Sequence, residues 1–446
     1  MGRLRPKARV FAVRRTFSEY CLKATAIPLR QNKGWPSNGV AGVADIAART
    51  DSARLNKCDY LCNEYSKMRT FLLLSVILLS VSSCLSSGKK ELNGYFYDVD
   101  GLTVLDLNGS WHQMGCQYGT LAKEKLDDVL AYLDLKLGCD AEKINSAAKV
   151  ADSLYLNYPD YLKVFFDGAS LTSGISPERL KLCNAVEYVE GVFLCSAMAV
   201  WNDYGTGKLV FGRNYDAASY REIDKDVVVT VFHPENGIAA ATVGYAGELY
   251  CVNGMNAKGL FIELNNGMPS AGDDIHWNLC PSTSSLFNML FEAESLDDVD
   301  SFFESTRSSL SSVIGVADKK EARSYEWCYD GVRRGDVMTK DGLMISTNHY
   351  VNPGWHFTVP TDDISWNSIS RRSNLANKAE EYKGRIGVEK MKEIMSTPLE
   401  AGGPMHSLTR YQIVAVPEDM ILHINIPSNG KWVELKMNDF FHRRKR

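Results

Sequence analysis

The sequence lacks the surplus of basic residues that nucleic-acid binding requires. Its 50 lysine and arginine residues are balanced by 54 aspartate and glutamate residues, which gives a formal net charge of −4. Nucleic-acid-binding domains gather positive charge on one face. The basic run at 442–446 is short, and we interpret it as a solvated chain end. We therefore expect no nucleic-acid partner.

Metal-ligand and phosphate-loop patterns are also missing. The eight histidines include no His-Glu-x-x-His, and the pair Cys58 and Cys62 lacks a second pair of ligands. The Gly-Thr-Gly-Lys segment at 205–208 lacks the upstream glycine of a phosphate-binding loop, and Leu209 occupies the position of its Ser or Thr. We interpret that segment as a hairpin turn, and we expect neither a metal nor a cofactor.

The apolar stretch that follows Met68 is too short to cross a bilayer. It contains about a dozen apolar residues, whereas a membrane span takes roughly 20. A basic residue precedes it and small residues follow it, as in a secretory signal. The Val-Ser-Ser-Cys that ends at Cys84 resembles the lipid-attachment box of bacterial lipoproteins. The alternative is an ordinary cleaved signal with an incidental cysteine.

We therefore expect residues 68–84 to be a lipoprotein-type signal peptide. Lipidation of Cys84 would anchor the protein to a membrane, as an exported bacterial lipoprotein that is periplasmic or attached to the outer membrane. Residues 1–67 carry no sustained periodicity, and we interpret them as a disordered leader or a mis-assigned start.

Apolar periodicity divides the remaining chain into a mainly helical part and a mixed part. Residues 95–107 alternate as a strand, and helical spacing follows at 111–133, 141–168 and 176–192. Beyond Cys195, short β-rich runs are separated by Gly, Asn and Asp turns. They lie at 196–201, 209–214, 227–233, 239–245, 249–253, 260–265, 312–329, 343–347 and 411–435. Further helices are expected at 283–307, 371–383 and 387–396. Hairpins with intervening helices favour antiparallel sheets in an α+β fold.

Cys195 marks the change from helical to strand patterns. It opens an alternating apolar run, and Arg213 and Asp216 follow in a Gly-Arg-Asn-Tyr-Asp segment. Cleavage of the Leu194–Cys195 bond would leave a thiol and a free α-amine on one residue. An α-amine has a pKa of about 7.7–8.0, close to that of an effective general base at neutral pH. We therefore predict that Cys195 supplies both nucleophile and base.

Five motifs, in order between about 95 and 435, resemble the N-terminal nucleophile hydrolases. The relevant group contains the choloylglycine hydrolases and the acyl-coenzyme A:6-aminopenicillanic acid acyltransferases. The segment 109–119 resembles the pro-segment signature of the acyltransferase branch, and 212–216 matches Gly-Arg-Asn-x-Asp. The Gly-Met-Asn-Ala-Lys-Gly-Leu at 254–260, followed by Leu-Asn at 264–265, resembles a third motif. Thr-Asn at 347–348 and Ser-Arg at 370–371 resemble the last two.

The resemblance implies a four-layer αββα fold with a mainly helical pro-segment. Residues 91–194 would become an α chain, and residues 195–446 a catalytic β chain. The Cys195 thiol would attack the carbonyl of Leu194, and an N-to-S acyl shift followed by hydrolysis would cut the chain. The mature enzyme would cleave the amide bond of a small-molecule N-acyl substrate, or transfer its acyl group through a Cys195 thioester.

The resemblance also implies roles for the remaining site residues. Asp216 would hold the amine and thiol in register, and Arg213 would favour the thiolate. Asn265 and Asn348 would donate hydrogen bonds to the developing oxyanion. Arg371 would orient the site or a substrate carboxylate. The acyl group and the amine of the substrate are left unassigned. The resemblance is also compatible with a homo-oligomer.

Two other interpretations compete with this one. A dyad of Cys195 and His349 would give papain-like peptidase chemistry without self-cleavage. Nucleophiles of that kind begin a helix, whose dipole favours the thiolate, whereas 196–201 has the pattern of a strand. The second alternative is a binding lipoprotein without catalysis, which the joint presence of Cys195, Arg213, Asp216 and Asn348 disfavours.

Overall fold

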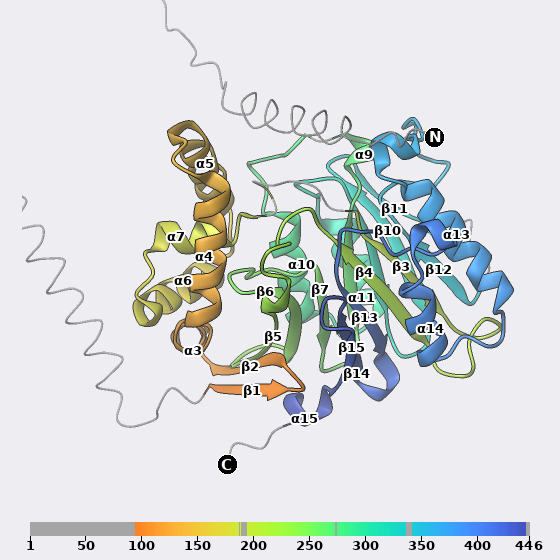
Figure 1. Cartoon of the computed structure of the whole chain (residues 1–446), viewed down its shortest axis with the longest axis horizontal. Helices are drawn as coiled ribbons and strands as arrows, with labels where there is room; N and C mark the ends of the chain where they lie inside the picture. The colour runs from red at the N-terminus through yellow and green to blue at the C-terminus, as the bar shows by residue number, and fades with distance from the viewer. Residues whose placement is uncertain (1–93, 187, 189–193, 273, 336–340, 443–446) are drawn as a thin grey trace, which may run out of the picture. The chain divides into compact units, whose positions relative to one another are not determined.

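The computed structural model describes residues 94–442, apart from 187, 189–193, 273 and 336–340 (Figure 1). The predicted leader, the signal peptide and Cys84 lie outside the described residues. Within the described ranges, no helix combines the length and the apolar character needed to cross a membrane.

Two β-sheets form the centre of the described chain. The larger sheet has the strand order β1-β2-β5-β6-β7-β8-β9-β10-β11, and the smaller has the order β12-β3-β4-β13-β14-β15. The strands of the larger sheet are β1 (Tyr95–Val99), β2 (Leu102–Gly109), β5 (Val227–Pro234), β6 (Ala240–Tyr245), β7 (Asn253–Asn256), β8 (Phe261–Asn266), β9 (Ser312–Ala317), β10 (Ala322–Cys328) and β11 (Gly331–Arg334). Those of the smaller sheet are β12 (Leu343–Ser346), β3 (Ser196–Val200), β4 (Val210–Asp216), β13 (Thr409–Val416), β14 (Ile421–Ile426) and β15 (Lys431–Lys436).

Neighbouring strands pair antiparallel, as predicted, with one exception. Strand β2 pairs parallel to β5, with Thr103 opposite Val228. Strands β1 and β2 come from the predicted pro-segment, so the pro-segment contributes two strands to a sheet that the predicted β chain completes. The two predicted pieces therefore share one core.

Helices cover the outer faces of both sheets. The segment before Cys195 contributes α3 (Trp111–Leu121), α4 (Lys123–Leu137), α5 (Ala141–Leu156), α6 (Asp160–Ser173) and α7 (Pro177–Cys183). The larger sheet is also covered by α10 (Ser282–Glu292) and α11 (Leu296–Ser305), and the smaller by α13 (Ser368–Glu381) and α14 (Val388–Met395). Short helices are α9 (Met268–Ala271), α12 (Asp362–Ser365) and α15 (Asn438–Phe441). These layers form the αββα arrangement, which confirms the predicted fold class.

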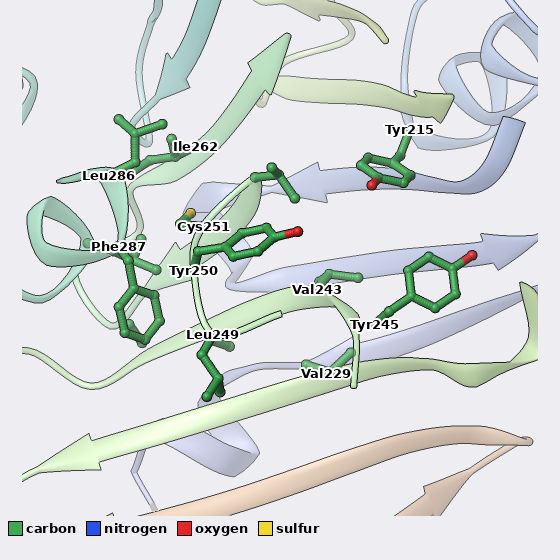
Figure 2. Close-up of a cluster of buried hydrophobic side chains, with 14 of the residues drawn as sticks. Tyr215, Val229, Val243, Tyr245, Leu249, Tyr250, Cys251, Ile262, Leu286 and Phe287 are labelled. Carbon is green, nitrogen blue, oxygen red and sulfur yellow. The ribbon is translucent and has the colours of Figure 1, made fainter. Parts of the chain in front are cut away.

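Strand β8 shows how the period of two places functional side chains. Phe261, Glu263 and Asn265 face the smaller sheet, where the ring of Phe211 lies 5.0 Å from that of Phe261. Ile262 points the other way, into the core under α10. Figure 2 shows part of that core, with Ile262 of β8, Val229 of β5, Val243 of β6 and Leu286 of α10 among the residues drawn. Successive residues of a strand thus point to opposite faces of the sheet.

Several predicted helices and strands are divided in the structure. The predicted helix 141–168 breaks at Pro159, which lacks the N–H that a continuous helix needs. The predicted helix 283–307 breaks before Ser295, whose hydroxyl accepts a hydrogen bond from the Asp298 N–H and starts α11. The predicted strand 95–107 is a hairpin that turns at residues 100–101, both with positive φ.

The predicted strand 249–253 is wrong over most of its length, because regular pairing starts only at Asn253. The N–H of Leu249 donates to Asn184 Oδ1 at 2.6 Å, and the N–H of Cys251 donates to the Thr283 carbonyl at 3.1 Å. These backbone groups therefore bind neighbouring segments instead of another strand.

Helices α3 and α6 approach each other through glycines. A Cβ added to Gly168 would lie 2.4 Å from the carbonyl oxygen of His112, and one added to Gly115 would lie 2.2 Å from that of Phe165. Gly168→Ala is therefore expected to reduce the free energy of unfolding by about 1–3 kcal/mol, because backbone must move. Urea unfolding measures the effect, and Asp167→Ala, an exposed change on the same helix, is the control. An unchanged midpoint for Gly168→Ala would show that the helices separate at no cost.

Candidate active site

Cys195 is buried directly before β3, as the sequence predicts. Its exposed fraction is 1%, and its Sγ lies 3.9 Å from the backbone oxygen of Asp216. The N–H of Leu194 donates to the same oxygen at 2.9 Å, and Arg371 Nη1 donates to the Cys195 carbonyl at 2.5 Å. Hydrogen bonds to their backbone groups therefore hold in place the residues on both sides of the predicted cleavage bond. Burial raises the pKa of the thiol to about 11, and the charge of Arg213 acts in the opposite direction.

Arg213 crosses from β4 to the larger sheet and is fully buried. Its Nε donates to Asn253 Oδ1 at 2.9 Å and its Nη2 to the Leu264 carbonyl at 2.6 Å. Its Nη1 donates to Asn265 Oδ1 and lies 2.9 Å from Glu263 Oε2. A buried charge persists when it is paired and fully hydrogen-bonded. These contacts hold the guanidinium group of Arg213 in one position. Arg213 lies next to strand β3, which begins directly after Cys195.

Only one of the two carboxylate oxygens of Asp216 has a hydrogen-bond partner. Its Oδ1 accepts a hydrogen bond from the Thr409 hydroxyl at 2.6 Å, whereas its buried Oδ2 has no hydrogen-bond partner. Burial raises its pKa to about 6, against the opposing charge of Arg371. A buried acceptor without a partner is costly, and here it lies on a residue that contacts Cys195. The free lone pairs of Oδ2 are able to accept a hydrogen bond from a donor group that forms next to Cys195.

Asn348 and Arg371 form a connected pair behind Cys195. Arg371 Nη2 donates to Asn348 Oδ1 at 2.8 Å, and this turns Nδ2 of Asn348 toward the carbonyl of Asn266, 2.9 Å away. The structure therefore brings Asn348, Arg371 and Cys195 together. The neighbouring Arg372 instead donates to the Ile345 carbonyl. Of the two adjacent arginines, Arg371 is the one at the site.

Asn265 has a different environment from the one the resemblance implied. Its Nδ2 donates to Glu263 Oε1 at 3.0 Å and to Ser346 Oγ at 3.1 Å, and its Oδ1 accepts from Arg213. Both amide hydrogens are thus engaged within the chain. In this conformation Asn265 supports Arg213, and its oxyanion role stays a prediction.

Three residues of the network were not predicted. Glu263, Ser346 and Thr409 lie outside the recognised motifs, yet each contacts a predicted site residue. A signal for Glu263 existed in the sequence. A glutamate within an apolar strand pattern, two residues before a polar motif residue, is expected to share the face of that residue.

The structure offers no positive support for the alternative dyad of His349 and Cys195. Its Nδ1 lies 2.7 Å from Ser368 Oγ, which also accepts the N–H of Asn348. Burial, together with the charges of Arg372 and Arg371, lowers the pKa of His349 to about 4. Cys195, directly before β3, also does not lie in a helix. An imidazole with so low a pKa is a weak general base for the Cys195 thiol.

Within the described ranges, no group of three or more His, Cys, Asp or Glu residues is placed to hold a metal ion. The cysteines in the part of the chain that the structure describes are free thiols, and among them Cys195 is joined to the buried arginine and aspartate network.

Residues 202–411 match the model of the acyl-coenzyme A:6-aminopenicillanic acid acyl-transferase family. The search of curated proteins found no match. Among solved structures, the chain is similar to a Caenorhabditis elegans orthologue of N-acylethanolamine-hydrolyzing acid amidase at 18% identity and a TM-score of 0.39, over 50% of this chain and 93% of that one. A conjugated bile acid hydrolase variant from Clostridium perfringens matches at 14% identity and a TM-score of 0.40, over 56% and 95%. Penicillin V acylase from Agrobacterium tumefaciens matches at 10% identity and a TM-score of 0.32, over 52% and 83%.

Proposed function

We propose, from the match of residues 202–411 to this acyl-transferase family, that the chain is an N-terminal nucleophile hydrolase and a self-cleaving cysteine amidohydrolase. Its substrate is a small N-acyl amide. The observation that carries the proposal is the free Oδ2 of Asp216 on the residue that contacts Cys195. An α-amine created at Cys195 is the donor that this oxygen lacks.

Maturation begins with attack of the Cys195 sulfur on the carbonyl carbon of Leu194. The C–N bond to Cys195 breaks, its nitrogen takes the proton of the thiol, and a thioester joins the two residues. Water then hydrolyses the thioester, which leaves a carboxylate on Leu194 and restores the thiol. The backbone contacts of Leu194 and Cys195 with Asp216 and Arg371 hold the bond in place during these steps.

Turnover repeats this chemistry on a substrate amide. The α-amine accepts the thiol proton and passes it to the leaving amine, while Asp216 holds the amine through its Oδ2. Arg213 stabilises the thiolate, since a nearby positive charge favours the charged form of a thiol. The acyl group stays on sulfur until water removes it. A lipoprotein outside the cytoplasm has little access to coenzyme A, so we propose water as the acceptor.

Asn348 is the proposed oxyanion donor, because Arg371 already orients its amide. Asn348→Ala is expected to lower kcat by a factor of about 10² to 10³ with little change in KM, as loss of one such donor does elsewhere. Steady-state kinetics on the self-cleaved protein measure this effect. Asn425→Ala, which removes a buried amide bound to Gln412, serves as the control. An equal decrease in kcat in both variants would show that general instability, and not the loss of an oxyanion donor, causes the effect.

We also propose that a lipid at Cys84 anchors the enzyme outside the cytoplasm. The proposal rests on the signal-like segment 68–84. Incorporation of labelled fatty acid in a bacterial host, and its loss in Cys84→Ser, would support it. Wild-type protein that takes up no label would contradict lipidation at Cys84. Such a protein would be exported by the ordinary signal pathway or retained in the cell.

Acyl trapping tests the proposed activity. Wild-type protein is incubated with N-acyl amides of varied acyl chain and amine, with and without hydroxylamine. A thioester intermediate predicts release of the amine and formation of an acyl hydroxamate, since hydroxylamine competes with water for the acyl group. Amine release without any hydroxamate, at saturating hydroxylamine, would contradict a covalent acyl-enzyme.

A further inference from the structure

Glu326 is a buried carboxylate on β10, with an exposed fraction of 0%. Its neighbours Tyr325 and Trp327 pack against Phe303 of α11, with ring centres 4.5 and 5.2 Å away. Because side chains alternate along a strand, Glu326 points to the other face of the sheet, toward the smaller sheet. No step of the proposed reaction uses this group, although burying a carboxylate is expensive.

The carboxylate of Glu326 binds the backbone of the chain that follows β12. The N–H of Val351 donates to Oε1, and the N–H of Asn352 donates to Oε1 at 3.1 Å and to Oε2 at 3.2 Å. Hydrogen bonds to an ionised acceptor are roughly twice as strong as those between neutral groups. One side chain thus fixes two consecutive peptide groups.

Residues 347–352, which we call the Asn348 segment, lie outside the helices and strands. Side chains of other elements bind its backbone. The N–H of Asn348 donates to Ser368 Oγ of α13 at 2.7 Å, and the N–H of Tyr350 donates to Ser270 Oγ of α9 at 2.8 Å. Together with the bonds to Glu326, these contacts take the place of strand pairing. The position of Asn348 therefore depends on side-chain anchors.

We propose that Glu326 is a positioning residue whose ionised carboxylate anchors the Asn348 segment and thereby holds the Asn348 amide at the developing oxyanion. This inference rests on the proposed function, in which Asn348 is the oxyanion donor. Val351 follows Asn348 by only three residues. A displacement of about 1 Å in a catalytic group is enough to cost about 10²-fold in rate. Glu326 acts on the reaction only through this backbone.

Two arginines on neighbouring elements face Glu326. The charge of Arg372, on α13, favours the ionised carboxylate, and Arg333 lies opposite Glu326 on β11. The indole of Trp355 and the phenol of Tyr350 face the carboxylate from the chain after β12. Burial raises the pKa of Glu326 to about 7, and the bound N–H groups oppose this shift. The anchor therefore loses its charge as the pH falls through the neutral range.

Glu326→Gln removes the charge of the anchor and keeps its size. A neutral amide oxygen accepts the two N–H groups less strongly than a carboxylate does. We expect kcat to fall about tenfold, with KM within about twofold of the wild-type value, because the anchor acts on the oxyanion donor and not on substrate binding. The loss is smaller than the factor of about 10² to 10³ for Asn348→Ala, since the donor is still present.

The ratio of the wild-type kcat to that of Glu326→Gln is expected to depend on pH. Protonated Glu326 is as uncharged as glutamine. The ratio should therefore decrease from about tenfold at about pH 9 to about twofold at about pH 6. Other titrating groups act alike on both proteins, so the ratio isolates this carboxylate. A ratio that does not change with pH would overturn the inference.

A double variant separates positioning from general instability. If Glu326 acts through Asn348, adding Glu326→Gln to Asn348→Ala should change kcat by no more than about twofold. Losses that multiply in the double variant would contradict the inference. Asp300→Asn is the matched control, because Asp300 of α11 accepts the Tyr325 hydroxyl at 2.6 Å on the opposite face of β10. It should keep the wild-type kcat, and a loss equal to that of Glu326→Gln would also contradict the inference.

Hydrogen exchange tests the anchor without substrate turnover. In Glu326→Gln, mass spectrometry of the peptide that spans 347–352 is expected to show exchange about tenfold faster than in the wild type. A wild-type protein that is never cut and releases no amine refutes the proposed function, whatever the exchange shows. A cut and active protein in which Glu326→Gln leaves this exchange unchanged refutes only the role of Glu326. The two failures are therefore distinguishable.

Discussion

Cys195→Ala is expected to yield a single uncut chain that releases no amine from any N-acyl amide. The substitution removes the sulfur that attacks both the Leu194 carbonyl and the substrate. Loss of a nucleophile of this kind lowers kcat by a factor of about 10⁵ or more. Denaturing electrophoresis and an amine-release assay measure the two outcomes on the same preparation.

A second buried cysteine provides the control for Cys195→Ala. Cys251 is equally buried, and burial raises the pKa of its thiol to about 12. Cys251→Ala is expected to be cut and active. A cut and active Cys195→Ala would remove this residue from the mechanism, and uncut chains in both variants would point to misfolding.

Asp216→Asn is expected to lower kcat/KM by a factor on the order of 10³, because the amide cannot hold a protonated α-amine as a carboxylate does. In the structure Oδ1 is already bound by Thr409, so the change falls on the free Oδ2. Self-cleavage should persist at a reduced rate, since it precedes formation of the amine. Kinetics are therefore measured on the cut fraction, over a range of pH.

Asp226→Asn is the matched control for this substitution. Asp226 is also buried, but its Oδ1 is paired with Lys125 at 3.1 Å, in the short helix η1 (Asp224–Asp226). Its variant should keep the wild-type rate. Asp216→Asn with a rate within a few-fold of wild type would contradict the role of the carboxylate in holding the amine.

The sequence was sufficient to predict where Cys195, Arg213 and Asp216 lie in the fold. Cys195 precedes an alternating apolar run, and the structure starts β3 one residue later. Arg213 and Asp216 were placed on the next strand, which pairs with β3 as a hairpin. These features are local: period, turn residues and a short motif determine them without knowledge of distant segments.

Contacts that depend on tertiary packing could not be predicted from the sequence. Glu263, Ser346 and Thr409 come from three strands, and only the stacking of the two sheets brings them to Arg213 and Asp216. The environment of Asn265 was missed for the same reason: both of its amide hydrogens find partners that are defined by packing.

The pairing of β2 with β5 was also not predictable from local signals. It joins residues more than a hundred positions apart, in a parallel register that hairpin patterns do not indicate. The irregular course of residues 249–252 has a similar origin, because Asn184 and Thr283 bind backbone groups that a strand would use. In both cases distant segments overrode a local preference.

Intact mass and amino-terminal sequencing of the purified wild-type protein test the central claim most directly. The account predicts two chains, one of which begins Cys-Ser-Ala at residue 195, with masses that sum to the uncut chain plus one water. A single chain that retains the Leu194–Cys195 bond after prolonged incubation, in protein shown to be folded, would contradict it.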